Sequence, residues 1–314
     1  MSALNDERYL ELRPLLFSIS YRMLGQVTEA EDIVQEAFLR LHRAQSGGTM
    51  IQSTKAFLSA VTTRLSIDYL RSAKARRETY VGNWLPEPLL TDARAEDPAE
   101  VSATADSLSM AFLLVLERLS PVERAVFLLR DVFGYGFDEI APIVDKSAAN
   151  CRQIAVRARR HVADERPRFE ASPQRRNELA DRFVTALREG DMDGLVDLLA
   201  ADVTVYGDSG GTSPSWPRAI VGAETVSRLM VSIGAQIGTV GVTVTRAEVN
   251  GQPGAVLRDP GGRLINVFSF DIANGTVQTI RSVINPDKLQ HLGPLADLDA
   301  LLGEVRHSRR EGRA

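Results

Sequence analysis

Apolar residues recur at helical spacing through the first quarter of the chain. Three stretches show the three-or-four-residue repeat that gathers apolar side chains on one face of an α-helix: residues 10–24, 30–42 and 55–77. Residues 45–53, which contain Gly47-Gly48, lose this repeat and are expected to form a loop. The pattern therefore predicts an all-α bundle over residues 1–80.

A second all-α domain is predicted over residues 107–170. Ser120 before Pro121, with Glu123 following, is a strong helix-start signal, because serine caps a helix and proline fits its first turn. Residues 81–106 lie between the two helical domains and are expected to be a linker, since their prolines interrupt helix.

The pattern changes to strands after Pro173. Residues 176–199 keep helical spacing and are expected to form one or two amphipathic helices. Alternating and β-branched runs then predict strands at residues 203–206, 240–249, 255–258, 264–271 and 275–283, with hairpin turns at Asn274-Gly275 and at residues 259–262. We expect an α+β domain with antiparallel strands over residues 174–290, followed by a helical and basic tail over residues 291–314.

Composition narrows the classes of protein. The chain has 314 residues, of which 44% are hydrophobic, enough to fill the cores of two or three domains. One cysteine, Cys151, excludes an internal disulfide framework, no apolar run has the length of a membrane span, and the N-terminus lacks the apolar core of a secretion signal. These features predict a cytoplasmic protein. The scattered histidines give no metal-ligand spacing, so neither a metal nor another cofactor is expected.

Charge is segregated along the chain. The net charge of −4 by itself argues against a nucleic-acid partner. However, basic residues cluster at 64–77 and 152–176, while acidic residues dominate 29–36 and 92–100. Because local patches decide binding to phosphates, the two basic stretches are candidate nucleic-acid contacts.

Residues 137–160 have the layout of a helix-turn-helix DNA-binding motif. A short helix, a turn and an arginine-rich helix from Ser147 would place the second helix in the major groove. Ser147 is expected to cap this helix, and Ile154 with Val156 or Ala158 to face inward. Its candidate contacts to bases and phosphates are Lys146, Ser147, Asn150, Arg152, Gln153, Arg157, Arg159 and Arg160. The alternative is a basic surface helix of an ordinary bundle.

Two further helices carry candidate binding residues. The helix at 55–77 combines Arg64 and Arg71 with the hydroxyls of Ser59, Thr62, Thr63 and Ser66, which suits phosphate and single-strand contacts. The adjacent loop at 45–53 could hold an unstacked base. The acidic helix at 29–40 fits a protein partner. For both helices the alternative is a solvated charged face.

These segments resemble bacterial extracytoplasmic-function (ECF) sigma factors. Tyr21 to Gly25, Glu29 to Arg40 and Ala56 to Arg71 are similar to sigma domain 2, and Leu116 to His161 is similar to sigma domain 4. The resemblance implies a factor that binds core RNA polymerase, at the β′ clamp helices and the β flap. It also implies that the factor directs transcription initiation at promoter DNA without covalent chemistry of its own.

The resemblance also implies roles for individual residues. Contacts to the β′ clamp helices would come from Asp32, Gln35, Glu36, Phe38, Leu39 and Arg40. The −10 promoter element would be melted and held by the loop at 45–53 and by Lys55, Arg64, Asp68, Arg71, Lys74, Arg76 and Arg77. The helix from Ser147 would read the −35 element.

The C-terminal block resembles a SnoaL-like domain of the NTF2 type, a cone of helices in a curved sheet. Three motifs are similar to those of the ECF sub-family with this extension: Trp84-Leu85-Pro86-Glu87-Pro88, Asn285-Pro286-Asp287-Lys288-Leu289, and Asp208-Ser209-Gly210-Gly211-Thr212. In the last motif Ser209 and Thr212 stand where the sub-family has glycine and lysine. We expect an intramolecular contact between linker and domain that regulates promoter access, made by Trp84, Pro86, Glu87, Asp208, Gly210, Gly211, Asn285, Pro286, Asp287 and Lys288.

Two other functions stay open at this point. The cone could be a small-molecule sensor or enzyme fused to a DNA-binding module, although its predicted sheet holds no histidine to pair with a carboxylate. Tyr206, Asp208 and Trp216 would then line a cavity, or else be ordinary core and turn residues. A helix-turn-helix repressor would give no reason for the acidic helix around Asp32.

Overall fold

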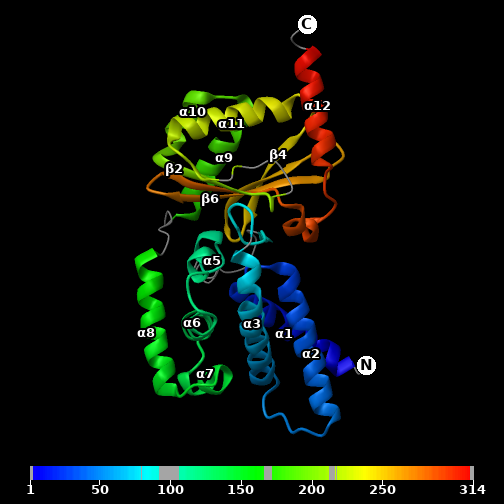
Figure 1. Ribbon diagram of the computed structural model, residues 1–314, viewed down its shortest axis with the longest axis vertical. Helices are drawn as coiled ribbons and strands as arrows, with labels where there is room; N and C mark the ends of the chain where they lie inside the picture. The colour runs from blue at the N-terminus through cyan, green and yellow to red at the C-terminus, as the bar shows by residue number, and fades with distance from the viewer. Residues whose placement is uncertain are drawn as a thin grey trace. The chain divides into compact units, whose positions relative to one another are not determined.

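The computed structural model describes residues 3–78, 80–91, 106–165, 172–211, 216 and 218–311 (Figure 1). The chain divides into two compact units. The first joins Met1–Thr79 to Phe112–Arg166, and the second joins Tyr80–Ala111 to Pro167–Ala314. The stretch expected to be a linker therefore belongs to the same unit as the C-terminal domain.

Three helices form the N-terminal bundle of the first unit: α1 (Ala3–Leu24), α2 (Val27–Ser46) and α3 (Thr54–Glu78). Each of them packs against the other two. Their shared core contains Leu16, Val34, Ala37, Leu41, Leu58 and Val61, and all of these except Leu16 are positions that the helical repeat placed on the apolar faces. The turn at residues 47–53 between α2 and α3 confirms the expected loop.

The rest of the first unit holds the helix-turn-helix. In chain order it comprises the end of α5 (Met110–Leu116), α6 (Pro121–Phe127), a π-helical turn η1 (Leu128–Val132), α7 (Phe137–Val144) and α8 (Ala148–Glu165). The predicted helix start is confirmed, because Glu123 N donates to Ser120 Oγ (3.3 Å) and Ser120 N donates to Glu123 Oε2 (3.1 Å). Asn150 N likewise donates to Ser147 Oγ (3.2 Å), which confirms the cap of α8.

The structure decides which of the two expected residues, Val156 or Ala158, joins Ile154 on the inner face of α8. Ile154, Ala155 and Ala158 are buried, whereas the Val156 side chain is 53% exposed. Residues 151, 154, 155, 158 and 162 share one face at 3.6 residues per turn, and residue 156 falls outside it. Of the two alternatives expected beside Ile154, the structure therefore has Ala158 on the inner face and Val156 outside it.

The second unit is built on a seven-stranded sheet with the order β1-β4-β5-β6-β7-β2-β3. The strands are β1 (Leu90–Thr91), β2 (Leu199–Asp208), β3 (Ile220–Val221), β4 (Thr243–Val249), β5 (Gln252–Arg258), β6 (Leu264–Ala273) and β7 (Thr276–Val283). All neighbouring pairs are antiparallel except β2 and β7, which run parallel with Val205 opposite Ile280. The expectation of antiparallel pairing was thus wrong for this one pair. It places the first long strand, β2, beside the last one, β7.

Three helices cover one face of this sheet: α9 (Pro173–Glu189), α10 (Met192–Leu198) and α11 (Ala223–Gly238) (Figure 1). Phe183 of α9 meets Phe270 of β6 edge-on, with ring centroids 5.0 Å apart, at the centre of the core. The β6–β7 turn has φ of 52° at Asn274 and 76° at Gly275, the left-handed pair that a tight hairpin needs. This arrangement confirms the predicted α+β cone.

The chain ends in two short 3-10 turns and a helix. These are η2 (Pro286–Lys288), η3 (Gln290–Leu292) and α12 (Leu298–Glu311). The tail helix was expected from Leu292, but it begins only at Leu298, because Gly293 (φ 128°) and Pro294 separate it from η3. Leu301 and Val305 of α12 are buried.

Candidate nucleic-acid interface and linker site

The acidic helix α2 presents a mixed charged and apolar face. Its exposed residues include Asp32, Gln35, Leu39 and Arg40, and the Leu39 side chain is 51% exposed. Arg40 Nε donates to Glu36 Oε1 (2.8 Å), and this hydrogen bond lowers the pKa of the Glu36 carboxyl. Phe38 instead packs toward the bundle, with its ring 4.6 Å from that of Tyr9. Single exposed apolar side chains are common on protein surfaces, so Leu39 leaves this face available to a protein partner without by itself identifying one.

Helix α3 places its charged residues outside and its hydroxyls inside. Lys55, Arg64, Asp68 and Arg71 are exposed, and Arg71 pairs with Asp68 at 3.4 Å. Ser59, Thr62, Thr63 and Ser66 are fully buried, with Thr63 Oγ1 donating to the Ser59 carbonyl (2.8 Å) and Ser66 Oγ to that of Thr62 (2.9 Å). The expectation that these hydroxyls contact nucleic acid was therefore wrong. The side chains of Lys74, Arg76 and Arg77 lie outside the described part of the chain.

Arg64 is engaged with the helix-turn-helix. Its Nε donates to the Ile143 carbonyl (3.1 Å) and its Nη2 to the Pro142 carbonyl (2.6 Å), both in the last turn of α7. Nearby, Tyr135 Oη and Ser59 Oγ are hydrogen-bonded at 2.8 Å. Within the first unit, α3 and α7 are therefore held together by the side chain expected to contact the −10 element.

Buried arginines strengthen the same packing. Arg124 of α6 is 3% exposed, and its Nη1 donates to the Met23 carbonyl of α1. The Arg22 guanidinium lies 5.8 Å over the Phe133 ring, and burial lowers the pKa of Arg22 to about 10. Both contacts join the N-terminal bundle to the segment that precedes the helix-turn-helix.

Helix α8 turns a basic stripe toward solvent. Arg152, Gln153, Arg157 and Arg160 are exposed, as are Lys146 and Ser147 before the helix, while Asn150 is partly buried. The Arg152 guanidinium lies 5.5 Å over the Phe137 ring of α7. Arg159 Nε donates to Asp131 Oδ1 (2.8 Å), which draws this arginine toward its own domain. The stripe suits contacts to base edges and phosphates.

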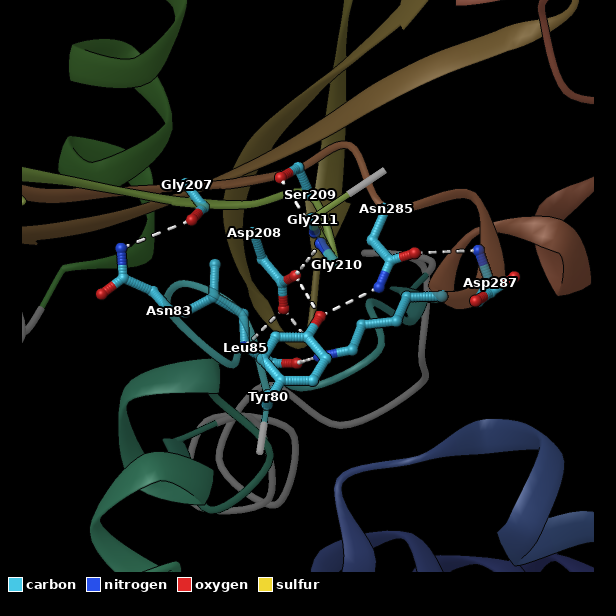
Figure 2. A network of polar contacts seen from close by, with 11 residues as sticks. Tyr80, Asn83, Leu85, Gly207, Asp208, Ser209, Gly210, Gly211, Asn285 and Asp287 are labelled. Carbon is cyan, nitrogen blue, oxygen red and sulfur yellow. Dashed lines mark hydrogen bonds and ion pairs between the residues drawn. The ribbon is translucent and has the colours of Figure 1, made fainter. Parts of the chain in front are cut away.

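The motifs of the second unit meet at Asp208, the last residue of β2 (Figure 2). Asp208 is fully buried. Its Oδ2 accepts hydrogen bonds from Leu85 N (2.7 Å) and from Lys288 Nζ (2.6 Å), and its Oδ1 accepts from the Tyr80 hydroxyl and from Gly210 N (3.2 Å). One carboxylate thus joins the linker, the β2 loop and the 3-10 turn η2.

Lys288 is enclosed by linker groups. Its Nζ lies 4.4 Å from the Trp84 ring centroid and 4.9 Å from that of Tyr80, and it also donates to the Leu85 carbonyl. Two aromatic faces and a carboxylate stabilise the positive charge of an ammonium group that is buried away from water. Burial and the Asp208 carboxylate raise the pKa of Tyr80 well above its ordinary value, so its hydroxyl stays protonated and donates.

Two glycines let the β2 loop approach η2. Gly210 has φ of 63°, and a Cβ there would lie 2.5 Å from Asn285 Nδ2. Gly211 has φ of 77°, and a Cβ would lie 3.1 Å from Val81 Cβ. Ser209 is not in the left-handed region, so a side chain is tolerated where the sub-family motif has glycine. Thr212 lies outside the described residues, and the lysine that meets Asp208 is Lys288.

The linker residues on both sides of 92–105 are also fixed to this sheet. Strand β1 pairs with β4, and Asn250 Oδ1 accepts from Leu89 N (3.0 Å). On the far side, Asn250 Nδ2 donates to the Leu108 carbonyl (3.1 Å), and Asp106 pairs with Arg176 of α9 at 3.6 Å. The sequence motifs did not predict that Tyr80, Asn250 or Asp106 belong to this site. Their partners are far away in sequence, and no neighbouring residue identifies them.

The other motif residues complete this linker site. Asn285 Nδ2 donates to the Tyr80 hydroxyl (2.9 Å), and Asn285 Oδ1 caps η2 by accepting from Asp287 N (3.1 Å), with Pro286 at the first position of the turn. Pro86 and Glu87 are buried. His291 Nε2 lies 2.8 Å from the Pro88 carbonyl. The 208–212 and 285–289 motifs therefore both contact the linker through their described residues.

The interior of the cone shows no constellation for catalysis in its described part. Tyr206 and Asp208 alternate with Val203 and Val205 of the core, so they lie on the sheet face away from the helices. Trp216 packs against the core. Two cavities of about 260 and 380 Å³ are lined by residues 264–299 and 187–245 respectively, and the described lining pairs no histidine with a carboxylate.

Neither a membrane span nor a metal site stands out among the described residues. None of their helices combines the length and apolarity needed to cross a bilayer. No three of their His, Cys, Asp or Glu side chains gather as metal ligands would.

Replacing Lys288 by Met should release the linker. The buried Asp208 carboxylate would lose its cation, a loss worth about 3 kcal/mol for a buried pair, so the Leu85 amide should exchange its hydrogen about a hundredfold faster. Hydrogen exchange read at residues 80–91 measures this. Arg228→Met, which breaks the exposed Arg228–Glu224 pair, is the control and should leave that exchange unchanged. Unaltered protection of Leu85 in Lys288→Met would contradict the role given to the pair.

Linker docking should weaken in acid through His291. Its neutral ring donates from Nε2 to Pro88, while buried Nδ1 has no hydrogen-bond partner in the described part, and burial lowers the pKa of His291 below 6.5. The folded state thus disfavours protonation of His291. The stability that the neutral ring contributes is therefore fully present above the ordinary pKa of histidine, and it is lost as the pH falls through the lowered pKa of the folded state. Thermal melting between about pH 8 and about pH 5 should show the loss in the wild type and not in His291→Gln. The variant of exposed His42, His42→Gln, should keep the wild-type profile.

Comparison with known proteins identifies the parts of the chain. Residues 8–76 match the family Sigma-70 region 2, residues 109–162 match Sigma-70 region 4, and residues 180–284 match the SnoaL-like domain family. These matches cover both helical domains and the cone, in the expected order.

Whole-length relatives share the same arrangement. The ECF RNA polymerase sigma factor SigJ of Mycobacterium tuberculosis is 38% identical over 307 residues, which cover 95% of this chain and 97% of the relative. The probable ECF RNA polymerase sigma factor SigI of the same species is 33% identical, covering 89% of this chain and 93% of the relative. The crystal structure of SigJ matches with a TM-score of 0.72 at 36% identity, covering 92% of this chain and 99% of that chain. The motifs had pointed to an actinobacterial sigma factor J in particular, and this similarity is confirmed. The chain therefore belongs to the ECF RNA polymerase sigma factors and is an alternative sigma factor for transcription initiation, not an enzyme, with a C-terminal SnoaL-like domain.

Proposed function

We propose that this sigma factor keeps its two DNA-binding regions apart from the promoter until its SnoaL-like domain releases the linker. The exposed face of α2 would bind the β′ clamp helices, the 45–53 loop and α3 would hold the melted −10 strand, and α8 would read the −35 element. The α5–α8 domain would rest on the β flap. These partners place its work in the cytoplasm, with the polymerase and the chromosome.

The proposed domain boundaries follow from these roles. Residues 1–80 would act on the polymerase and the −10 element, residues 107–170 on the −35 element, and residues 174–290 as the regulator, with 291–314 as a tail. Residues 81–106 connect the two helical domains in sequence, but they belong to the same compact unit as the C-terminal domain. They would be the part of the chain through which the regulator acts.

The packing of α3 on α7 supports a closed resting form. Elements centred 10 and 35 base pairs upstream lie about 85 Å apart along straight duplex, at 3.4 Å per base pair. Arg64 cannot hold the α7 carbonyls, at 2.6 to 3.1 Å, while α3 and α8 occupy two sites so far apart. Promoter binding therefore requires these hydrogen bonds to break and the two regions to separate.

The linker site supplies the means of control, and it carries the proposal. The chain that joins α3 to α5 is tied to one sheet on both sides of residues 92–105, through Asp208 and Asn250. A segment fixed at both ends cannot extend as a free spacer can. The regulator thus limits how far the two regions separate, and releasing Tyr80 and Leu85 from Asp208 would remove that limit.

Base reading by α8 predicts position-specific losses. Gln153→Ala, and likewise Arg152→Ala, should lower affinity by about 1–3 kcal/mol at particular −35 base pairs and little at others, since a hydrogen bond to one base edge is removed. Run-off transcription with core polymerase on single-base-pair variants measures this. Arg159→Ala serves as the control and should leave the base preference unchanged, because Arg159 is held by Asp131. Equal losses on every sequence from Gln153→Ala would refute base reading there.

Cis regulation predicts that damage to the linker site alters promoter use. Chains cut after Arg168 or after Leu289, and the Lys288→Met variant, should differ from the full chain in output or promoter selectivity by about fivefold or more, the usual size of a coupling between sites. Transcription by core polymerase on a promoter library is the assay, with Arg228→Met as the matched control. If both truncated chains behave like the full chain, the domain has no regulatory role.

A further inference from the structure

The exposed face of α8 carries one large apolar residue in its described part. Val156 is 53% exposed, whereas Ile154, Ala155 and Ala158 are buried against the rest of the domain. At 3.6 residues per turn, Val156 lies between Gln153 and Arg160 and beside Arg152 and Arg157. It therefore occupies the centre of the basic stripe.

Helix stability does not explain a valine there. A β-branched side chain loses rotamer freedom in a helix and has lower propensity than alanine, arginine or glutamine. At 53% exposure Val156 keeps about half of its side chain in water, and the neighbouring exposed positions 152, 153, 157 and 160 are all polar or charged. Single exposed apolar residues are common on protein surfaces, so the position of Val156 inside the basic stripe, and not its exposure alone, points to a face that DNA covers.

Contacts within the domain fix which face of α8 is available. The Arg152 guanidinium lies over the Phe137 ring at 5.5 Å, and Arg159 is drawn to Asp131 at 2.8 Å. The Arg159 contact holds one flank of the helix to η1, whereas the ring contact leaves Arg152 exposed. The basic stripe, with Val156 in it, is therefore the face that is left to enter the groove.

The major groove offers one apolar group to such a side chain. Among the four base pairs, only thymine presents a methyl group there, on C5, and small apolar side chains contact it. Resting on the proposed role of α8 in reading the −35 element, we propose that Val156 selects a thymine in that element through this methyl group. Gln153 and Arg157 would supply hydrogen bonds to adjacent bases or phosphates.

Deoxyuridine provides the direct test, since it differs from thymine only by lacking the methyl group. The full chain with core polymerase first selects its promoter from a library, and each thymine of the selected −35 element is then replaced singly by deoxyuridine. At one position the replacement should lower transcription about fourfold, the factor expected for one methyl group losing its apolar contact. In Val156→Ala the ratio between thymine and deoxyuridine at that position should fall to about one.

The control is a valine of similar exposure in the other unit. Val221 is 56% exposed, and Val221→Ala should keep the fourfold ratio. The inference is overturned if the selected element contains no thymine, if no replacement has an effect, or if the effect persists in Val156→Ala or is lost in Val221→Ala. Absence of any selected promoter with the wild-type chain would instead refute the proposed function itself, and the inference with it.

Discussion

The ion pair between Asp208 and Lys288 joins three parts of the second unit that are far apart in sequence: the end of β2, the 3-10 turn η2 and the linker. Both groups are buried, and burying a charge is costly unless its other hydrogen-bonding positions are filled. Those positions are filled largely by the linker: Tyr80 and Leu85 complete the carboxylate, and Leu85 with two rings encloses the ammonium. The domain therefore needs the linker to satisfy its own buried charges. Docking of the linker and stability of the domain are consequently coupled.

This dependence changes how the linker works. The prolines of this stretch predicted a simple spacer between the two helical domains. Its described residues on both sides of 92–105 are instead hydrogen-bonded to one sheet. In the proposed mechanism, a change that weakens the linker site would alter the reach of the chain between α3 and α5. That reach would decide whether Arg64 can leave the α7 carbonyls. Control of promoter access would then follow from chain geometry.

Helix α8 combines a packed inner face with an outer face that we propose to be the DNA reader. Small and branched apolar residues fill its inner face, so the helix lies close to α6 and α7. Its outer face keeps arginines, a glutamine and one valine, and aromatic and carboxylate contacts from Phe137 and Asp131 orient that face. The inner residues set the rotation of the helix about its axis, and this rotation would decide which side chains meet DNA in the proposed function.

Local signals in the sequence determined much of this protein. Helical spacing, the Ser120 cap and the Asn274-Gly275 turn depend on residues a few positions apart, and each was predicted and confirmed. The motifs identified the family and brought Trp84, Asp208 and Lys288 forward as partners. Only the tertiary structure decided the partnership of Tyr80 with Asp208, the parallel pairing of β2 with β7, the helix α11, the burial of the α3 hydroxyls and the outward turn of Val156. The physical reason is that these features depend on which distant surfaces come together in space, and no spacing within one segment records that.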